Sequence, residues 1–246
     1  MLKKAIISGP PTSYELLSLE SFRCPIDGSR IVEKWRCEKG HTFREVDGII
    51  DFLMVDVPTH DLLEKVSPIY ETVWAPFGML VTSGKTYSWI MSSSAKIVGR
   101  THLDIGTGTG KLFDFASCEE CVGLDVSMNF LRQLRKRRPK VLAVRGDARK
   151  LPFSDEVFES VSSLFVLHMI DDQESAVYEM YRVMKKGGKG IVIVMSDNNA
   201  LDKILAKWWG YSLKTLDQYV SMFGRYFKVE SAEKLGAWSV IRFVKT

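Results

Sequence analysis

From Arg100 onward, short apolar runs alternate with amphipathic segments. Runs rich in branched apolar side chains predict strands, and segments with apolar residues every three or four positions predict helices. Their alternation is typical of parallel strands joined by crossover helices, so it predicts an α/β fold with a mainly parallel sheet. The expected strands are 101–105, 121–125, 141–145, 158–165 and 189–195, and the expected helices are 110–117, 128–138, 172–184 and 199–222.

Two more apolar runs close the chain, at 226–230 and 238–244. Only a short segment separates them, which predicts a hairpin. We expect this hairpin to end the sheet with an antiparallel strand.

The residues before Arg100 show two other patterns. Residues 20–57 are rich in cysteine, glycine and charge, with short alternating runs, so 1–57 is expected to form a small β-rich module. Residues 58–99 carry apolar residues at helical spacing, interrupted by three prolines, and predict helices that cover the following domain. The expected domains are therefore 1–57, 58–99 and 100–246.

Composition narrows the class of protein. The 246 residues carry a formal net charge of +4, which by itself does not imply a nucleic-acid partner. No apolar run approaches the roughly 20 residues of a membrane helix, and the apolar stretch after Met1 is too short for a signal peptide. We expect a cytoplasmic protein whose four cysteines form no disulfide scaffold. In a reducing compartment, metal binding is the favoured use of such cysteines.

The strongest functional signal is the segment Leu103-Asp104-Ile105-Gly106-Thr107-Gly108-Thr109-Gly110. An acid near a strand end is followed by alternating glycines, and glycine lets backbone N–H groups approach a ligand. Two more acids, Asp125 and Asp147, follow the next two expected strands. Because the carboxyl ends of neighbouring parallel strands line one crevice, these positions predict a nucleotide-type ligand site.

These positions resemble those of class I S-adenosylmethionine-dependent methyltransferases of type 11, over about residues 100–195. The resemblance implies a doubly wound, Rossmann-like sheet of seven strands whose last strand is antiparallel. It also implies S-adenosylmethionine as the cofactor. Asp104 would hold the aminoacyl group, Asp125 the ribose hydroxyls and Asp147 the adenine amino group. The implied cofactor-binding residues are Asp104, Gly106, Thr107, Gly108, Gly110, Asp125, Val126, Met128, Asp147, Ala148 and Leu164.

Two other functions fit part of the pattern. An acid 19 positions after Gly106 also suits an NAD-linked oxidoreductase. Against this, the glycines run G-x-G-x-G rather than G-x-G-x-x-G, and an acid precedes them. A non-catalytic module that keeps the S-adenosylmethionine pocket is the third alternative. The sum of the motifs favours the methyltransferase.

Cysteines and a histidine form two knuckle-like turns near the N-terminus, at 23–28 and 35–41. Two such turns supply the four ligands of tetrahedral zinc, although Asp27 stands where a second cysteine is expected. The segment resembles N-terminal zinc ribbons fused to methyltransferases such as the large-subunit rRNA guanine-N1 methyltransferases. That resemblance implies zinc as a second cofactor and a contact with RNA, and an empty knuckle that keeps its fold is the alternative. The expected ligands are Cys24, Asp27, Cys37 and His41.

A second cysteine pair lies in Cys118-Glu119-Glu120-Cys121. The two glutamates raise the thiol pKa, which disfavours a redox pair. We expect two free thiols, one buried and one partly exposed.

The methyl acceptor is left open between a small or lipid-like molecule and a structured RNA. The Asn-Pro-Pro-Tyr type of loop is absent after the fourth strand of the α/β domain, which argues against adenine-N6 chemistry. His168, near the end of that strand, is the candidate base or orienting group. Tyr70 and Trp74 resemble a helix that lids the cofactor in small-molecule methyltransferases, although core packing also explains them.

A basic cluster on and after the helix expected at 128–138 offers a contact for RNA phosphates, with a solvated helix face as the alternative. Aromatic residues of the helix expected at 199–222 offer stacking for bases or cover for an apolar substrate. The cluster consists of Arg132, Arg135, Lys136, Arg137, Arg138 and Lys140, and the aromatic residues are Trp208, Trp209 and Tyr211.

Overall fold

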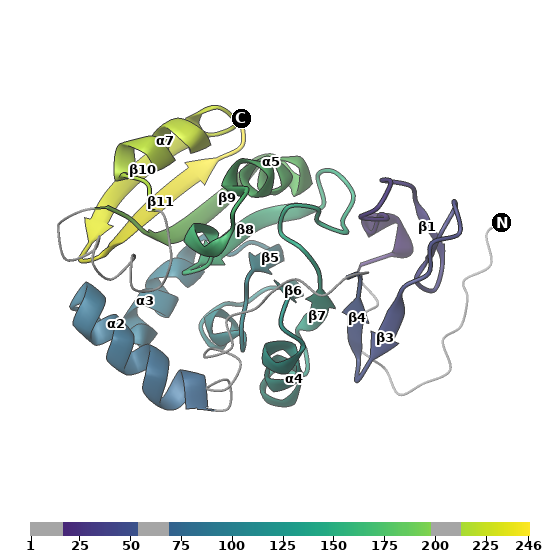
Figure 1. Ribbon diagram of the computed structural model, residues 1–246, viewed down its shortest axis with the longest axis horizontal. Coiled ribbons are helices and arrows are strands. Elements are labelled where there is room, and N and C mark those ends of the chain that lie inside the picture. Colours follow the sequence, from purple (N-terminus) through teal and green to yellow (C-terminus); the bar gives the residue numbers. More distant parts are fainter. Residues whose placement is uncertain (1–16, 54–68, 198–212) are drawn as a thin grey trace.

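A mixed sheet of nine strands forms the centre of the protein (Figure 1). The structure is a computed structural model that describes residues 17–53, 69–197 and 213–246. The strand order is β10-β11-β9-β8-β5-β6-β7-β4-β3. From β5 onward the strands are β5 (Thr101–Ile105), β6 (Glu120–Asp125), β7 (Leu142–Arg145), β8 (Phe158–Leu164), β9 (Met184–Met195), β10 (Lys228–Leu235) and β11 (Trp238–Val244).

Strand directions confirm the predicted fold class. Strands β5 to β9 run parallel to one another. Strand β11 is antiparallel to both β9 and β10, so the terminal hairpin closes this side of the sheet as expected. The order of these seven strands is that of a doubly wound sheet. From β5 the chain first adds strands on one side, β6 and β7, and then on the other side, from β8 onward.

Helices cover the sheet where the apolar periodicity predicts them, and their starts are capped by side chains. Ser127, Asp172 and Thr215 each accept a hydrogen bond from a backbone N–H in the first turn of the helix that follows. The α-helices of the described residues are α2 (Ala75–Ser83), α3 (Tyr87–Ser94), α4 (Met128–Arg137), α5 (Gln173–Val183) and α7 (Leu216–Gly224).

Two expected helices differ from the prediction. The helix expected at 110–117 is only the short 3-10 turn η5 (Lys111–Asp114). Only Leu112 of this turn is fully buried, which leaves little apolar surface to stabilise a longer helix. Of the helix expected at 199–222, α7 occupies the end, and Trp208, Trp209 and Tyr211 lie outside the described residues.

The N-terminal segment joins the same sheet, which the sequence did not predict. Its hairpin of β3 (Arg44–Val46) and β4 (Ile49–Asp51) lies beside β7, with β4 parallel to β7 (Figure 1). A separate two-stranded sheet pairs β1 (Ile31–Glu33) with β2 (Arg36–Cys37). The hairpin satisfies backbone groups that β7 would otherwise expose as an edge strand.

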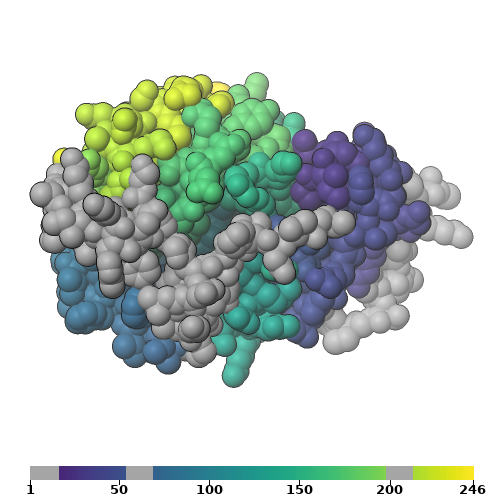
Figure 2. Space-filling view, in the orientation of Figure 1, coloured from purple at the N-terminus to yellow at the C-terminus, as the bar shows by residue number. Residues whose placement is uncertain are grey.

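An aromatic cluster packs the N-terminal segment against the loop after β7. The ring of Phe22 lies 5.5 Å from that of Phe153 and 6.0 Å from that of Phe52. Trp35 completes the cluster at 5.8 Å from Phe52. In the space-filling view the purple and blue N-terminal residues lie directly against the teal and green ones (Figure 2).

Within the three described ranges, no helix has both the length and the apolar character that crossing a bilayer requires.

Candidate functional site

A cavity of about 380 Å³ opens at the carboxyl ends of the central parallel strands. This is where ligands bind in doubly wound sheets. The structure brings nine of the eleven predicted cofactor residues to its wall and leaves Gly110 and Met128 outside it. The nine are Asp104, Gly106, Thr107, Gly108, Asp125, Val126, Asp147, Ala148 and Leu164.

The glycine turn after β5 requires glycine for two reasons. Gly106, Gly108 and Gly110 all have positive φ, which L side chains rarely adopt. A Cβ on Gly106 would also overlap the side chain of Val166 across the turn. Two amides of the turn donate to residues of β6. The amide of Gly106 donates to the carbonyl of Leu124 at 2.8 Å, and the amide of Gly108 donates to a carboxylate oxygen at the end of the strand, also at 2.8 Å. The turn is therefore held in one conformation with its backbone against the cavity.

That carboxylate belongs to Asp125, at the end of β6. Its Oδ2 accepts from the amide of Gly108 at 2.8 Å, and its Oδ1 accepts from the amide of Ser127 at 2.9 Å. An ionised carboxylate has about four acceptor sites, so both oxygens keep capacity for further donors. Such a group, fixed at the cavity wall, suits a ligand with two neighbouring hydroxyls.

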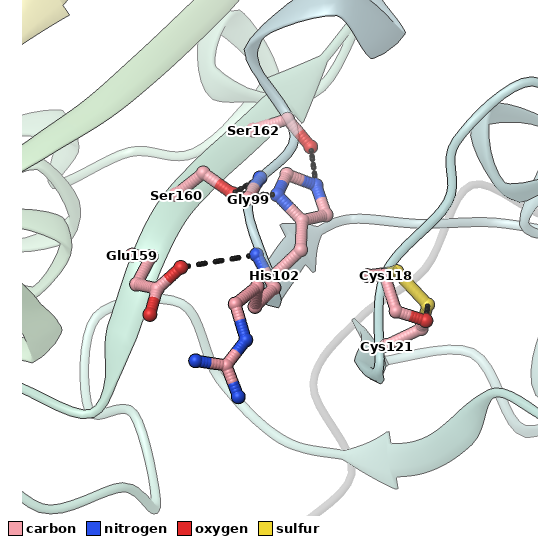
Figure 3. Close-up of a disulfide and its surroundings, with 8 residues drawn as sticks. Gly99, His102, Cys118, Cys121, Glu159, Ser160 and Ser162 are labelled. Atoms are coloured by element: carbon pink, nitrogen blue, oxygen red, sulfur yellow. Dashed lines mark hydrogen bonds between the residues drawn. A yellow bond between two sulfur atoms is a disulfide. The ribbon is translucent and has the colours of Figure 1, made fainter.

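A buried chain of hydrogen bonds ends on Asp104 of β5. Figure 3 shows its members Gly99, Ser160, His102 and Ser162. The amide of Gly99 donates to Ser160 Oγ at 2.8 Å, and Ser160 Oγ lies 2.7 Å from His102 Nδ1. His102 Nε2 lies 2.9 Å from Ser162 Oγ, which donates to Asp104 Oδ1 at 2.5 Å. Because the Ser162 proton points to the carboxylate, Nε2 must be the protonated nitrogen and Nδ1 the acceptor. Every donor in the chain then points towards Asp104.

Burial controls the charge of this chain. Desolvation raises the pKa of Asp104 to about 6, although the hydrogen bonds from Ser162 and Thr107 oppose the shift. Desolvation lowers the pKa of His102 to about 3, so the imidazole is neutral at pH 7. Asp104 is therefore a carboxylate at neutral pH that gains strongly from a cationic partner.

Asp147 lies in the loop after β7, beside Ala148. The guanidinium of Arg149 donates from Nη2 to Asp147 Oδ2 at 2.7 Å and from Nε at 3.0 Å. The amide of Arg149 donates to Oδ1 at 2.8 Å. These bonds orient the carboxylate at the cavity wall.

Several residues of the cavity wall were missed or misplaced by sequence reasoning. Phe130 takes the place predicted for Met128, which instead packs beside Leu131 in a separate apolar cluster. The sequence signal that could have pointed to Phe130 is the N-cap Ser127, whose side chain accepts from the amide of Phe130 and so orients the first turn of α4. Tyr70 lines the cavity, whereas Trp74 is 38% exposed and does not. Among the further residues missed are Tyr87, Met91, Lys111, Met169, Ile170 and Asp171.

His168 does not line the cavity. Its Nδ1 accepts from the amide of Met195 at 3.4 Å, and its ring packs edge-on against Trp238 at 5.6 Å. The residue is 6% exposed, and these two contacts hold its ring in the protein interior. The role of base stays a prediction that this placement does not favour.

The basic cluster is largely engaged within the chain. Arg138 binds Glu71 at 2.7 Å and Asp114 at 2.7 Å, with its side chain only 9% exposed. Arg132 pairs with Asp47 at 3.1 Å, and Arg135 donates to a backbone carbonyl. Arg137 also binds Glu71, at 3.2 Å, so at least four of the six side chains are engaged within the chain, and Arg138 is too buried to reach phosphates.

The four predicted metal ligands converge. One ligand atom from each lies within 4.8 Å of the others. His41 Nδ1 is 3.6 Å from Cys24 Sγ, 3.5 Å from Cys37 Sγ and 3.1 Å from Asp27 Oδ2. Metal–ligand bonds of zinc imply separations of roughly 3.5 Å between tetrahedral ligand atoms. Asp27 Oδ2 is buried without a hydrogen bond, while Ser29 satisfies Oδ1 and lowers the pKa of Asp27 to about 2.

The expectation of two free thiols at Cys118 and Cys121 is wrong. The structure joins them in a disulfide between η5 and β6 (Figure 3). Their Cα atoms lie 5.4 Å apart, which is an ordinary separation for a disulfide. Between the two cysteines, the amides of Glu119 and Glu120 donate to the carbonyl of Arg100, and the carboxylate of Glu119 accepts from the Arg100 guanidinium.

Solved structures share this fold. The methyltransferase in the complex with the methyltransferase activator Trm112 of Haloferax volcanii matches 76% of this chain and 99% of its own, with a TM-score of 0.64 at 16% identity. An S-adenosylmethionine-dependent methyltransferase of Thermotoga maritima matches 75% of this chain and 98% of its own, with a TM-score of 0.59 at 21% identity. At these identities the likeness concerns the fold alone.

Residues 103–192 match the family model described as a methyltransferase domain. With the strand order and the glycine turn, this match defines the segment as the core of a class I S-adenosylmethionine-dependent methyltransferase domain.

The chain is 31% identical over 140 residues to the demethylmenaquinone methyltransferase of Renibacterium salmoninarum, which covers 55% of this chain and 57% of that protein. It is 32% identical over 170 residues to the ubiquinone/menaquinone biosynthesis C-methyltransferase UbiE of Ectopseudomonas mendocina, which covers 62% of this chain and 66% of that protein. The chain thus spans little more than half the length of the first relative.

Proposed function

We propose that this chain transfers the methyl group of S-adenosylmethionine to a small apolar acceptor of the quinone type. The observation that carries the proposal is the single cavity in which three strand-end carboxylates meet a mostly apolar wall. The names of the sequence relatives support the acceptor class, because both act in quinone biosynthesis. An NAD-linked oxidoreductase is not favoured, since the matching family is that of methyltransferases.

The residues present fit the cofactor. Asp104 is 3% exposed and, within the described residues, has only neutral hydrogen-bond donors around its carboxylate, so a cationic group of a ligand would compensate its burial. Asp104 would bind the ammonium group, because a buried carboxylate gains from a charge-assisted hydrogen bond. Asp125 would accept from the ribose hydroxyls and Asp147 from the adenine amino group. When bound, the cofactor supplies a methyl group on a positively charged sulfur.

The acceptor end of the cavity is built for alignment and water exclusion. Tyr70, Tyr87, Met91, Phe165 and Met169 contribute aromatic and apolar surface to the cavity wall. Burial raises the pKa of Tyr70 to about 12, so its phenol stays protonated and donates a hydrogen bond without adding charge. Methyl transfer is an in-line displacement that such a wall accelerates by holding the acceptor and excluding water.

We further propose that Cys24, Asp27, Cys37 and His41 bind one zinc ion. The converging ligand atoms support it, among them the buried Asp27 Oδ2, which lies 3.1 Å from His41 Nδ1. The division into 1–57, 58–99 and 100–246 is retained as a proposal, with the hairpin of β3 and β4 serving both the first part and the sheet.

Binding and transfer measurements test the function. Titration calorimetry should show binding of S-adenosylhomocysteine and none of NADH. Asp125→Ala should weaken S-adenosylhomocysteine binding by about ten- to a hundredfold, since a hydrogen bond to a charged group contributes roughly 1.5–3 kcal/mol. A change of less than twofold would refute the ribose assignment.

A transfer assay tests the acceptor. Labelled S-adenosylmethionine should pass its methyl group to a demethylated naphthoquinol and not to total RNA. Label that appears only in RNA would replace the quinone acceptor with a nucleic acid.

A further inference from the structure

The N-terminal hairpin places a carboxylate beside the cofactor site. In the sheet, Asp51 of β4 pairs in register with Arg145 of β7, and Arg145 pairs in register with Asp125 of β6. The three charged residues therefore lie in one row across three adjacent strands. The middle residue of this row links the N-terminal segment to the ribose-binding carboxylate.

Arg145 contacts both sides of the row. Its Nη1 lies 3.4 Å from Asp51 Oδ2, and its Nε donates to the carbonyl of Val126 at 2.9 Å. Val126 follows Asp125 directly and lines the cavity. The Arg145 side chain is 12% exposed and that of Asp51 is fully buried. One guanidinium thus holds the cofactor-side turn with one nitrogen and the N-terminal carboxylate with another.

Asp51 is itself firmly placed. Its Oδ1 accepts from the amide of Leu53 at 3.1 Å, and its Oδ2 also accepts from Arg44 at 3.3 Å. Its neighbour Ile49 is fully buried against Leu131 of α4, the helix that begins after the Val126 turn. The hairpin can therefore not shift without disturbing the elements on both sides of that turn.

We propose that Asp51 and Arg145 are positioning residues for the cofactor. The N-terminal segment supplies the carboxylate that orients Arg145, and Arg145 fixes the turn at 125–127 in the shape that binds adenosine. Without the carboxylate, the buried guanidinium loses this charged partner and reorients towards its other acceptors or water. The carbonyl of Val126 then loses its donor, and the hydrogen bonds that aim the Asp125 carboxylate weaken. This inference rests on the proposed cofactor.

The test compares Asp51→Asn with Asp47→Asn in the full chain. Asp47 lies in the same hairpin and pairs with Arg132 of α4, but its side chain is 61% exposed. Calorimetry should show the dissociation constant of S-adenosylhomocysteine rising at least tenfold in Asp51→Asn and less than twofold in Asp47→Asn. With acceptor and S-adenosylmethionine, Asp51→Asn should raise the KM for S-adenosylmethionine and leave kcat within a factor of three.

A second variant covers the case in which Asp51→Asn fails to fold. Arg145→Lys keeps the positive charge but replaces the planar fork with one ammonium, which is less suited to holding both partners. It should weaken S-adenosylhomocysteine binding by a similar factor, and amide exchange at Gly108 and Ser127, which both donate to Asp125, should become faster in the free protein. Either folded variant binding with unchanged affinity overturns the inference. If the unaltered chain binds no S-adenosylhomocysteine, the proposed function itself has failed.

Discussion

At the scale of single residues, Asp104 combines burial with a chain of donors that all point at its carboxylate. The side chain is 3% exposed, and Ser162 and His102 connect it to the backbone of Gly99. Its place in the site was predictable, because an acid near a strand end before a glycine turn is a local pattern. The hydrogen-bond chain was not, because it joins β5 to β8 across 58 positions of sequence.

Cofactor affinity should fall at acidic pH. The pKa of Asp104 is raised to about 6 in the free protein, so below pH 6 the carboxyl is protonated and loses the cationic partner. The dissociation constant of S-adenosylhomocysteine should rise roughly tenfold between pH 7 and pH 5, as measured by calorimetry. Ser162→Ala should move the midpoint upwards, because Ser162 lowers this pKa.

Protonation of Asp104 does not unfold the protein, so unfolding caused by this group cannot account for the loss of affinity. A carboxyl whose pKa is higher in the folded than in the unfolded protein binds more protons when folded between about pH 4 and pH 6. Asp104 therefore favours folding as the pH falls through this range. An affinity independent of pH from 7 to 5 would contradict the role given to Asp104.

At the scale of elements, the glycine turn shows what backbone geometry contributes. Alternating glycines predicted a close approach of backbone to ligand, and the positive φ of Gly106 agrees with it. The contact with Val166 was outside the reach of sequence, because Val166 lies beyond β8. The same limit applies to Phe130 and Met128, since only the packing of α4 decides which of them reaches the cavity.

Gly106→Ala should destabilise the protein by about 1–3 kcal/mol, since the new Cβ adds overlap with Val166 to an unfavourable φ. Gly187→Ala is the matched control, with a similar φ of 74° and no atom within 4 Å of the added Cβ. It should cost roughly 1 kcal/mol, the backbone term alone. Urea unfolding measures both, and equal losses would show that the contact at Gly106 is unimportant.

At the scale of the whole molecule, the N-terminal segment is part of the sheet. Its knuckle, its aromatic cluster and its hairpin form one continuous packing from Cys24 and Cys37 to Phe52 and on to Phe153. The ligand spacing of the knuckle was visible in sequence. The docking of β4 on β7 was not, because a three-residue strand carries little pairing information.

Metal analysis should find one zinc per chain, and Cys37→Ser should remove it. Loss of the metal should lower the midpoint of thermal unfolding by roughly 5–10 °C, because an ion that binds only the folded state stabilises it. Cys118→Ser is the control, since it removes a sulfur outside the cluster and should leave the zinc content unchanged. Purified protein without metal and with an unchanged midpoint in Cys37→Ser would favour an empty knuckle.

The sequence by itself determined the α/β class, the strand-end acids, the glycine turn and the four converging ligands. These follow from short-range spacing, since period, strand ends and knuckle turns are local properties of the chain. Only the tertiary structure decided which side chains line the cavity, that the basic cluster is engaged internally, and that the N-terminal hairpin extends the sheet beside Arg145. These depend on contacts between segments as far apart as 94 positions, from Asp51 to Arg145, and local patterns do not specify which distant surfaces meet.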